Sequence, residues 1–134
     1  MKKEIINPDT VVTPVAPYAT LVKTSEMKGM AFLAGQVASD VENHILCVGD
    51  IAGQAAVVAE NIKKCLAAAG LGPEHVVSTT TYIIESVREA YFETGAFKVI
   101  LEAFDHPADT LIGVAALNGS ERGVLMEVSA IAVY

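Results

Sequence analysis

Residues 51–69 constrain the fold more than any other part of the chain. Apolar residues recur there at steps of three and four, the pattern of an amphipathic α-helix with one buried face. Asp50 is a suitable N-cap, and Gly70 suits the left-handed position that ends many helices. Glu60 and Lys64 are spaced for an ion pair on the polar side. A helix with one apolar stripe must pack against a second layer, which the rest of the chain has to supply.

The remaining segments supply a sheet and a second helix. The β-branched run from Val76 to Ile84 predicts a buried strand. A second helix is expected after Ser86, which is spaced from Glu89 as in a capping box, and Pro107 stops it. Gly95 weakens that helix in its interior. Further strands are predicted at 18–23, 30–34, 44–48, 110–117 and 124–133. This order predicts one α+β domain over residues 1–134, with both helices on one face of a mixed sheet.

Composition excludes several classes of function. Hydrophobic residues make up 52% of the chain and the net charge is −7, with Lys and Arg scattered along it. Without a basic patch, neither nucleic acid nor an anionic membrane is an expected partner. No apolar targeting segment or spanning run is visible, so we expect a cytoplasmic protein. The strands are apolar enough that we expect neighbouring subunits to cover the free face of the sheet.

The two cysteines are not spaced with histidines as metal ligands are. We expect Cys47 and Cys65 to be reduced thiols in or near the core. Cys65 lies near the end of the predicted helix, where the helix dipole disfavours a thiolate. The sequence therefore implies neither a metal site nor an organic cofactor.

A series of short motifs, in a fixed order, resembles the reactive-intermediate-deaminase (Rid, YjgF-like) family, also described as endoribonuclease L-PSP. The match runs along the whole chain, and each motif is weak by itself. The matching segments are Ala16-Pro17-Tyr18, Leu33-Ala34-Gly35-Gln36, Gly49-Asp50-Ile51 with Gln54, Asn61-Ile62-Lys63, Ala67-Ala68-Ala69-Gly70, Val76-Val77 with Thr79-Thr80, Pro107-Ala108, and Glu127-Val128 with Ala130-Ile131-Ala132-Val133. Ala16 and Ala34 replace the family's Gly and Ser, and Ser129 replaces a second acidic residue in the last strand.

The resemblance implies a chorismate-mutase-like fold and a homotrimer in which three sheets form a barrel and ligand clefts lie between subunits. Family deaminases hydrolyse reactive enamines and imines, such as 2-aminoacrylate, to keto acids and ammonia. Carried over residue by residue, the resemblance makes Tyr18, Gly35 and Thr110 substrate-binding candidates. It makes Glu127 the residue that positions or activates water. The arginine that holds the substrate carboxylate in the family is replaced by Asp109.

Asp109 departs most sharply from the family pattern. A guanidinium binds a carboxylate through two charge-assisted hydrogen bonds, whereas a carboxylate at that position repels it. One interpretation is that Asp109 contacts a cationic or hydroxylated ligand or acts as a general base. The other is that it caps a turn, three residues after His106. If Asp109 and Glu127 share one cleft, the two carboxylates would form an acid/base pair.

Each of the other candidates also has a structural alternative. Glu127 could be a solvated or ion-paired strand residue, and Thr110 could simply pack in its strand. Tyr18 could pack without lining a cleft. Arg88 and Arg122 are candidates to replace the missing cation, and His106 could contact a ligand or lie on the surface.

The sequence therefore leaves more than one function open. The first hypothesis is a hydrolase of the deaminase type that acts on a small enamine, imine or related metabolite, with Glu127 and Asp109 as catalytic candidates. The alternative is a non-catalytic small-molecule-binding or regulatory trimer. A ribonuclease activity, sometimes ascribed to the family, is disfavoured by the acidic charge and the absence of a basic groove.

Overall fold

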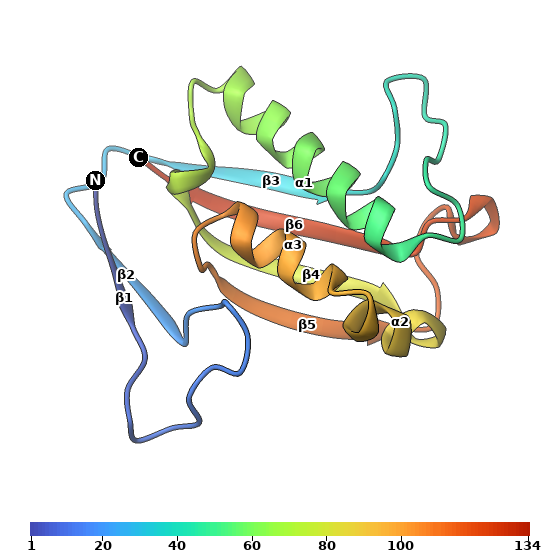
Figure 1. Cartoon of the computed structure of the whole chain (residues 1–134). Coiled ribbons are helices and arrows are strands. Elements are labelled where there is room, and N and C mark those ends of the chain that lie inside the picture. Colours follow the sequence, from blue (N-terminus) through green and yellow to red (C-terminus); the bar gives the residue numbers. More distant parts are fainter.

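The computed structural model of the protein describes all 134 residues as a sheet covered on one face by helices (Figure 1). Its helices are α1 (Ile51–Ala68), α2 (Arg88–Glu93) and α3 (Ala96–Ala103). Its strands are β1 (Lys2–Ile6), β2 (Leu21–Ser25), β3 (Met30–Gln36), β4 (Val76–Ile84), β5 (Ala108–Val114) and β6 (Met126–Val133). The α+β class with a mixed sheet, predicted from the sequence, is confirmed.

The strands form two separate sheets. The main sheet has the order β3-β6-β4-β5, in which β4 and β5 run parallel and the other neighbours antiparallel. Strands β1 and β2 pair only with each other, as a ribbon beside the main sheet (Figure 1). Ala19, just before β2, ties this ribbon to the main sheet because its N–H donates to the Pro107 carbonyl at 3.0 Å. This contact holds the segment before β2 against the start of β5.

Helix α1 confirms the amphipathic pattern of the sequence. The Asp50 carboxylate accepts a hydrogen bond from the Gly53 N–H at 2.9 Å, and Gly70 adopts φ 72° after the helix end. Glu60 pairs with Lys63, at 2.8 Å, rather than with Lys64 as predicted. Positions three apart are also neighbours on a helix surface, so the two lysines compete for one carboxylate.

The second helical segment is divided at Gly95, which has φ 76° and separates α2 from α3. A left-handed residue cannot continue a right-handed helix, which explains the break. The predicted capping box is wrong. Residues Glu85–Val87 form a short 3₁₀ turn instead, and α2 begins without a side-chain cap.

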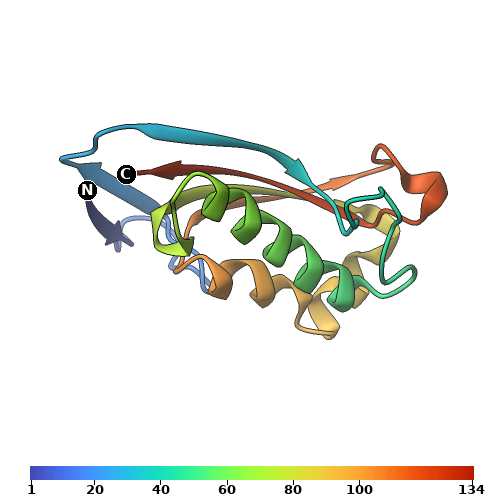
Figure 2. The ribbon, with the colours of Figure 1, turned by 90° about the horizontal axis from the view of Figure 1, so that it is seen from above.

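All three helices lie on one side of the main sheet (Figure 2). The core between the layers is built from the apolar stripe of α1, residues of α3, and alternate residues of β4 and β6. On the opposite face Phe32 is 73% exposed, and Met30 and Ile112 are also exposed. No helix combines the length and apolarity that crossing a bilayer requires.

Several local predictions differ from the structure. Cys47 and Cys65 are exposed, not near the core, because Cys65 lies off the apolar stripe of α1 and Cys47 lies in a loop. Residues 44–48 form no strand, although Ile45 makes a single bridge to Ser39. Strand β2 begins three residues later than predicted and β5 two residues earlier. Strand β1 was not predicted.

Candidate functional site

An open cavity of about 400 Å³ lies between helices α2 and α3 and the edge strand β5. Its walls are mostly aromatic and aliphatic, and Asp109 is its only acidic residue. No Lys, Arg or His lines it. The lining residues are Val15, Ala16, Tyr18, Tyr91, Phe92, Phe97, Leu101, Asp109, Thr110 and Leu111. Tyr18, Asp109 and Thr110, three of the residues selected from the sequence, therefore line one cavity. Alternation along β5 turns the Thr110 side chain to the opposite face of the sheet from that of Asp109.

Asp109 is held by two hydroxyl groups of the neighbouring strand. Thr79 and Thr81 of β4 each donate a hydrogen bond to Asp109 Oδ1, at 2.6 Å and 3.0 Å. Both threonines are 1% exposed, and alternation along β4 places them on the face of the sheet that the helices cover. Asp109 Oδ2 makes no hydrogen bond within the protein. The interpretation that Asp109 caps a turn is wrong, because it lies in β5 and bonds across to β4.

The surroundings of Asp109 make its negative charge costly. Burial raises the pKa of its carboxyl above the ordinary value, while the hydrogen bonds from Thr79 and Thr81 act in the opposite direction. No basic side chain lies within salt-bridge distance. An unpaired, half-buried carboxylate of this kind is typical of a functional site.

We expect the variant Asp109→Asn to be more stable than the wild type at neutral pH. Because the folded pKa is raised, the folded chain binds this proton more tightly than the unfolded chain does. Wild-type stability therefore falls as the pH rises from the ordinary carboxyl pKa through the folded pKa. The amide has no charge, so we expect Tm to rise by roughly 3 °C at pH 7 and the difference to vanish at acid pH.

This expectation is checked by thermal unfolding of both proteins between pH 3.5 and 8. The exposed Asp9 offers a control, since Asp9→Asn should leave Tm nearly unchanged across that range. An Asp109→Asn protein with lower Tm at pH 7 would contradict the expected cost of the buried charge.

Tyr91 of α2 provides a second polar group at the cavity. Its side chain is 3% exposed and its hydroxyl has no hydrogen-bond partner in the protein. Since no fully buried polar side-chain atom is left unpaired, the hydroxyl keeps some exposure, and Tyr91 lines the cavity. Burial, and next the charge of Asp109, raise the pKa of Tyr91 above its usual range. The phenol is therefore a neutral hydrogen-bonding group.

The remaining two candidate residues, Gly35 and Glu127, lie together at a different place. Glu127 alternates with the buried Met126 and Val128 on β6, so its side chain faces the side of the sheet without helices. Gly35 lies in an irregular part of β3 beside it, and a methyl group there would collide with the Glu127 carboxylate. One chain alone therefore places Asp109 and Glu127 on opposite faces of the sheet.

Comparison with known proteins identifies the family. The family model described as "Endoribonuclease L-PSP" matches residues 9–134. The chain belongs to the Rid family. Protein DfrA of Myxococcus xanthus is 34% identical over 140 residues, covering 99% of this chain and 97% of that protein. The 3-aminoacrylate deaminase RutC of Acinetobacter baylyi is 37% identical over 70 residues, covering 52% and 53%. The Rid protein YyfB of Yersinia pestis has a TM-score of 0.84 at 28% identity over the whole of both chains.

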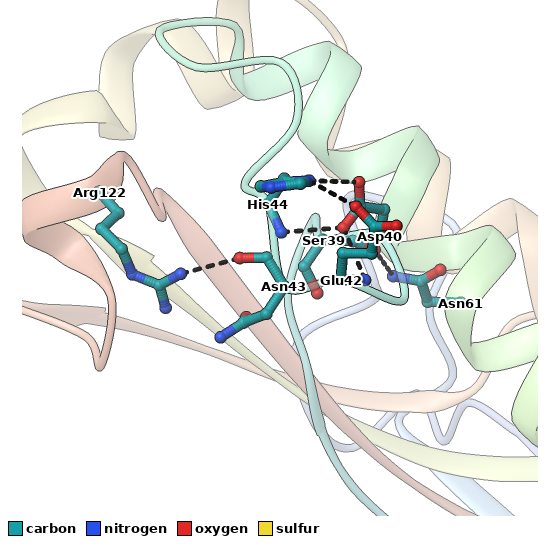
Figure 3. Close-up of polar contacts among 7 residues, drawn as sticks. All are labelled: Ser39, Asp40, Glu42, Asn43, His44, Asn61 and Arg122. Carbon is teal, nitrogen blue, oxygen red and sulfur yellow. Dashed lines mark hydrogen bonds and ion pairs between the residues drawn. The ribbon is translucent and has the colours of Figure 1, made fainter.

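Neither candidate arginine of this Rid protein reaches the cavity. Arg122 donates to the Asn43 carbonyl at 2.9 Å, and it lies beside the loop that Asp40 and His44 organise (Figure 3). Arg88 pairs with Glu85 at 3.3 Å and is exposed. His106 lies in an exposed loop and does not line the cavity either. Within one chain, nothing replaces the cation that the family resemblance calls for.

Three residues of the site were not selected from the sequence. Thr79 and Thr81 stand in the run Ser78–Thr81, and the period of a strand would have placed them on one face with a shared partner. Tyr91 lies in the apolar stripe of the second helix, where a tyrosine normally indicates packing only. No three His, Cys, Asp or Glu side chains lie close enough together to hold a metal ion.

Proposed function

We propose that this Rid-family chain is a hydrolase of the deaminase type that acts on a small enamine, imine or related metabolite at a cleft between subunits. The observation that carries the proposal is the cavity that Asp109 lines and to whose lining the same chain contributes no basic residue. Such a site repels the carboxylate of 2-aminoacrylate and similar imino acids. It favours a substrate whose nitrogen carries the positive charge.

The chemistry needs only water. Water adds to the carbon of the C=N bond, the nitrogen takes up protons, and ammonia leaves as the carbonyl forms; an enamine first becomes the imine by protonation at carbon. In this proposal Asp109 stabilises the protonated nitrogen, and Tyr18 and Thr110 border the substrate. Glu127 accepts the proton of the attacking water. Kinship with an enzyme named 3-aminoacrylate deaminase supports hydrolysis of a C=N compound.

Assembly is part of the proposal. Because Glu127 and Asp109 lie on opposite faces of one sheet, a substrate can reach both only when they come from different chains. The apolar side chains of Phe32, Met30 and Ile112 on the bare face support its burial against neighbouring copies, as a homotrimer. We propose that neither nucleic acid nor a membrane is a partner.

A non-catalytic role is the second candidate. The same separation of Asp109 from Glu127 favours it if the chain works as a monomer, because a ligand in the cavity would then not reach Glu127. The protein would then bind a small molecule without converting it, and it would have a regulatory role. Light scattering, which measures the mass of the assembly, distinguishes the hydrolase from the non-catalytic protein, since a stable monomer has no inter-subunit site.

Two substrates of opposite charge test the proposed reaction. Generating 2-aminoacrylate in situ, we expect wild type to release keto acid no faster than the uncatalysed reaction, because Asp109 repels the carboxylate. With an imine that has no carboxylate, formed from a primary amine by an amine oxidase, we expect ammonia release to accelerate. Asp109→Arg should lose the second activity and restore binding of the first substrate.

Full wild-type activity on 2-aminoacrylate would show that Asp109 does not set specificity. If no imine of either kind were hydrolysed by the assembled protein, the non-catalytic role would replace the hydrolase. Circular dichroism of Asp109→Arg checks that the larger side chain leaves the fold intact.

A further inference from the structure

We propose that the cavity beside Asp109 binds a small organic ammonium or iminium ion with an apolar, preferably aromatic, substituent, and that Tyr91 donates or accepts a hydrogen bond in that complex. The inference names the substrate class for the proposed function and therefore rests on the same site. It also makes a claim about binding that does not depend on turnover.

The charge of the cavity selects the sign of the ligand. Asp109 is its only acidic group, and no basic residue of the same chain lines it. Oδ1 already accepts from Thr79 and Thr81, so Oδ2 remains available to a donor. A charge-assisted hydrogen bond from an N–H⁺ group would relieve the cost of burying the carboxylate. An anionic ligand would add a second negative charge in the same space.

Tyr91 supplies the second polar contact. Its side chain is 97% buried, yet its hydroxyl has no partner in the protein, and Tyr91 lines the same cavity as Asp109. A phenol in that position can accept from the ammonium group or donate to a neighbouring oxygen of the ligand. Two separate elements, α2 and β5, thus each contribute to the lining of one cavity a residue with an unpartnered polar atom.

The walls select the rest of the ligand. Phe92 and Phe97 lie with ring centroids 5.4 Å apart, and Tyr91 meets Phe92 edge-on at 5.5 Å. Such rings bury an apolar substituent, and a ring face can also attract a cation. The Phe97 ring already has the Lys98 ammonium 5.6 Å from its centroid, so Tyr91 and Phe92 offer the free faces. The cavity of about 400 Å³ is within the usual range of small-molecule sites. A single phenyl ring with a short aminoalkyl chain fits this description, whereas a free amino acid places a carboxylate against Asp109.

Three probes with the same phenylethyl skeleton and different charge test the inference by calorimetry on the whole chain. We expect 2-phenylethylamine to bind at least about tenfold more tightly than 2-phenylethanol, and 3-phenylpropionate not to bind measurably. Asp109→Asn should remove that preference and leave the alcohol unchanged. Tyr91→Phe, which keeps the ring, should weaken the amine about three- to tenfold. The exposed Glu60 offers a control, and Glu60→Gln should bind all three probes as wild type does.

Equal binding of amine and alcohol, tight binding of the propionate, or no binding of any probe up to 10 mM would each overturn the inference. The inference would also be overturned if the Asp109→Asn variant, with a cooperative unfolding curve, bound the amine as tightly as the wild type does. Failure here is distinguishable from failure of the hydrolase proposal. If the protein binds the amine but hydrolyses no imine, the inferred binding site stands and the proposed hydrolase fails. If it hydrolyses imines without binding the amine, the hydrolase stands and the inferred binding site fails.

Discussion

Replacing Gln54 by leucine is expected to lower the free energy of unfolding by about 2–4 kcal/mol, although the two side chains have similar volumes. Gln54 of α1 is fully buried. Its Nε2 donates to the Gly123 carbonyl at 2.8 Å and lies within 3.3–3.4 Å of the Leu46 and Cys47 carbonyls. Its Oε1 accepts from the Leu125 N–H at 3.0 Å. Leucine would leave these backbone groups buried without partners.

Two loops depend on this one amide. The segment before α1 and the turn before β6 are far apart in the sequence, and Gln54 joins them to the helix. Urea unfolding followed by circular dichroism measures the effect, with Glu60→Gln on the same helix expected to change it by less than about 0.5 kcal/mol. An unfolding free energy of Gln54→Leu within that margin of wild type would mean that the backbone groups find other partners.

Local signals of the sequence predicted the regular elements best. Helix α1 carries its stripe and both caps within one segment, and β4 is dense in β-branched residues, so both were predicted to within one or two residues. Strand β1 escaped prediction because its sequence, KKEII, is charged and becomes a strand only by pairing with β2. The exposure of Cys65 follows from its angle around α1, which the stripe itself could have revealed.

The site was predictable only in part, because the sequence indicated which residues belong to it better than which face of the sheet each side chain lies on. Family resemblance selected Tyr18, Asp109 and Thr110, and all three line one cavity. The resemblance alone did not say that Asp109 and Glu127 point to opposite sides. The pairing of β4 with β5 and with β6, together with the alternation of side chains along each strand, places Asp109 and Glu127 on opposite faces. Tyr91 was missed because a buried aromatic residue looks the same whether or not its hydroxyl has a partner.

Replacing Glu127 by glutamine is expected to reduce hydrolysis of an accepted imine by about 10²- to 10⁴-fold, the usual contribution of a general base. The amide keeps the shape of the side chain and cannot take a proton from water. Gly35→Ala should give a smaller loss, since a methyl group there displaces the Glu127 carboxylate without removing it. Initial rates of ammonia release measure both effects, and the exposed Glu121, replaced by glutamine, is the control.

The placement of Glu127 and Asp109 on opposite faces allows a sharper test. If each site takes Asp109 from one chain and Glu127 from another, then Glu127→Gln and Asp109→Asn proteins are both impaired alone. Mixed and reassembled in equal amounts, they would form intact sites in about one quarter of random pairings and recover that share of activity. Recovery cannot occur when both residues act within one chain. A mixture as inactive as its components would contradict a site that takes Asp109 from one chain and Glu127 from another.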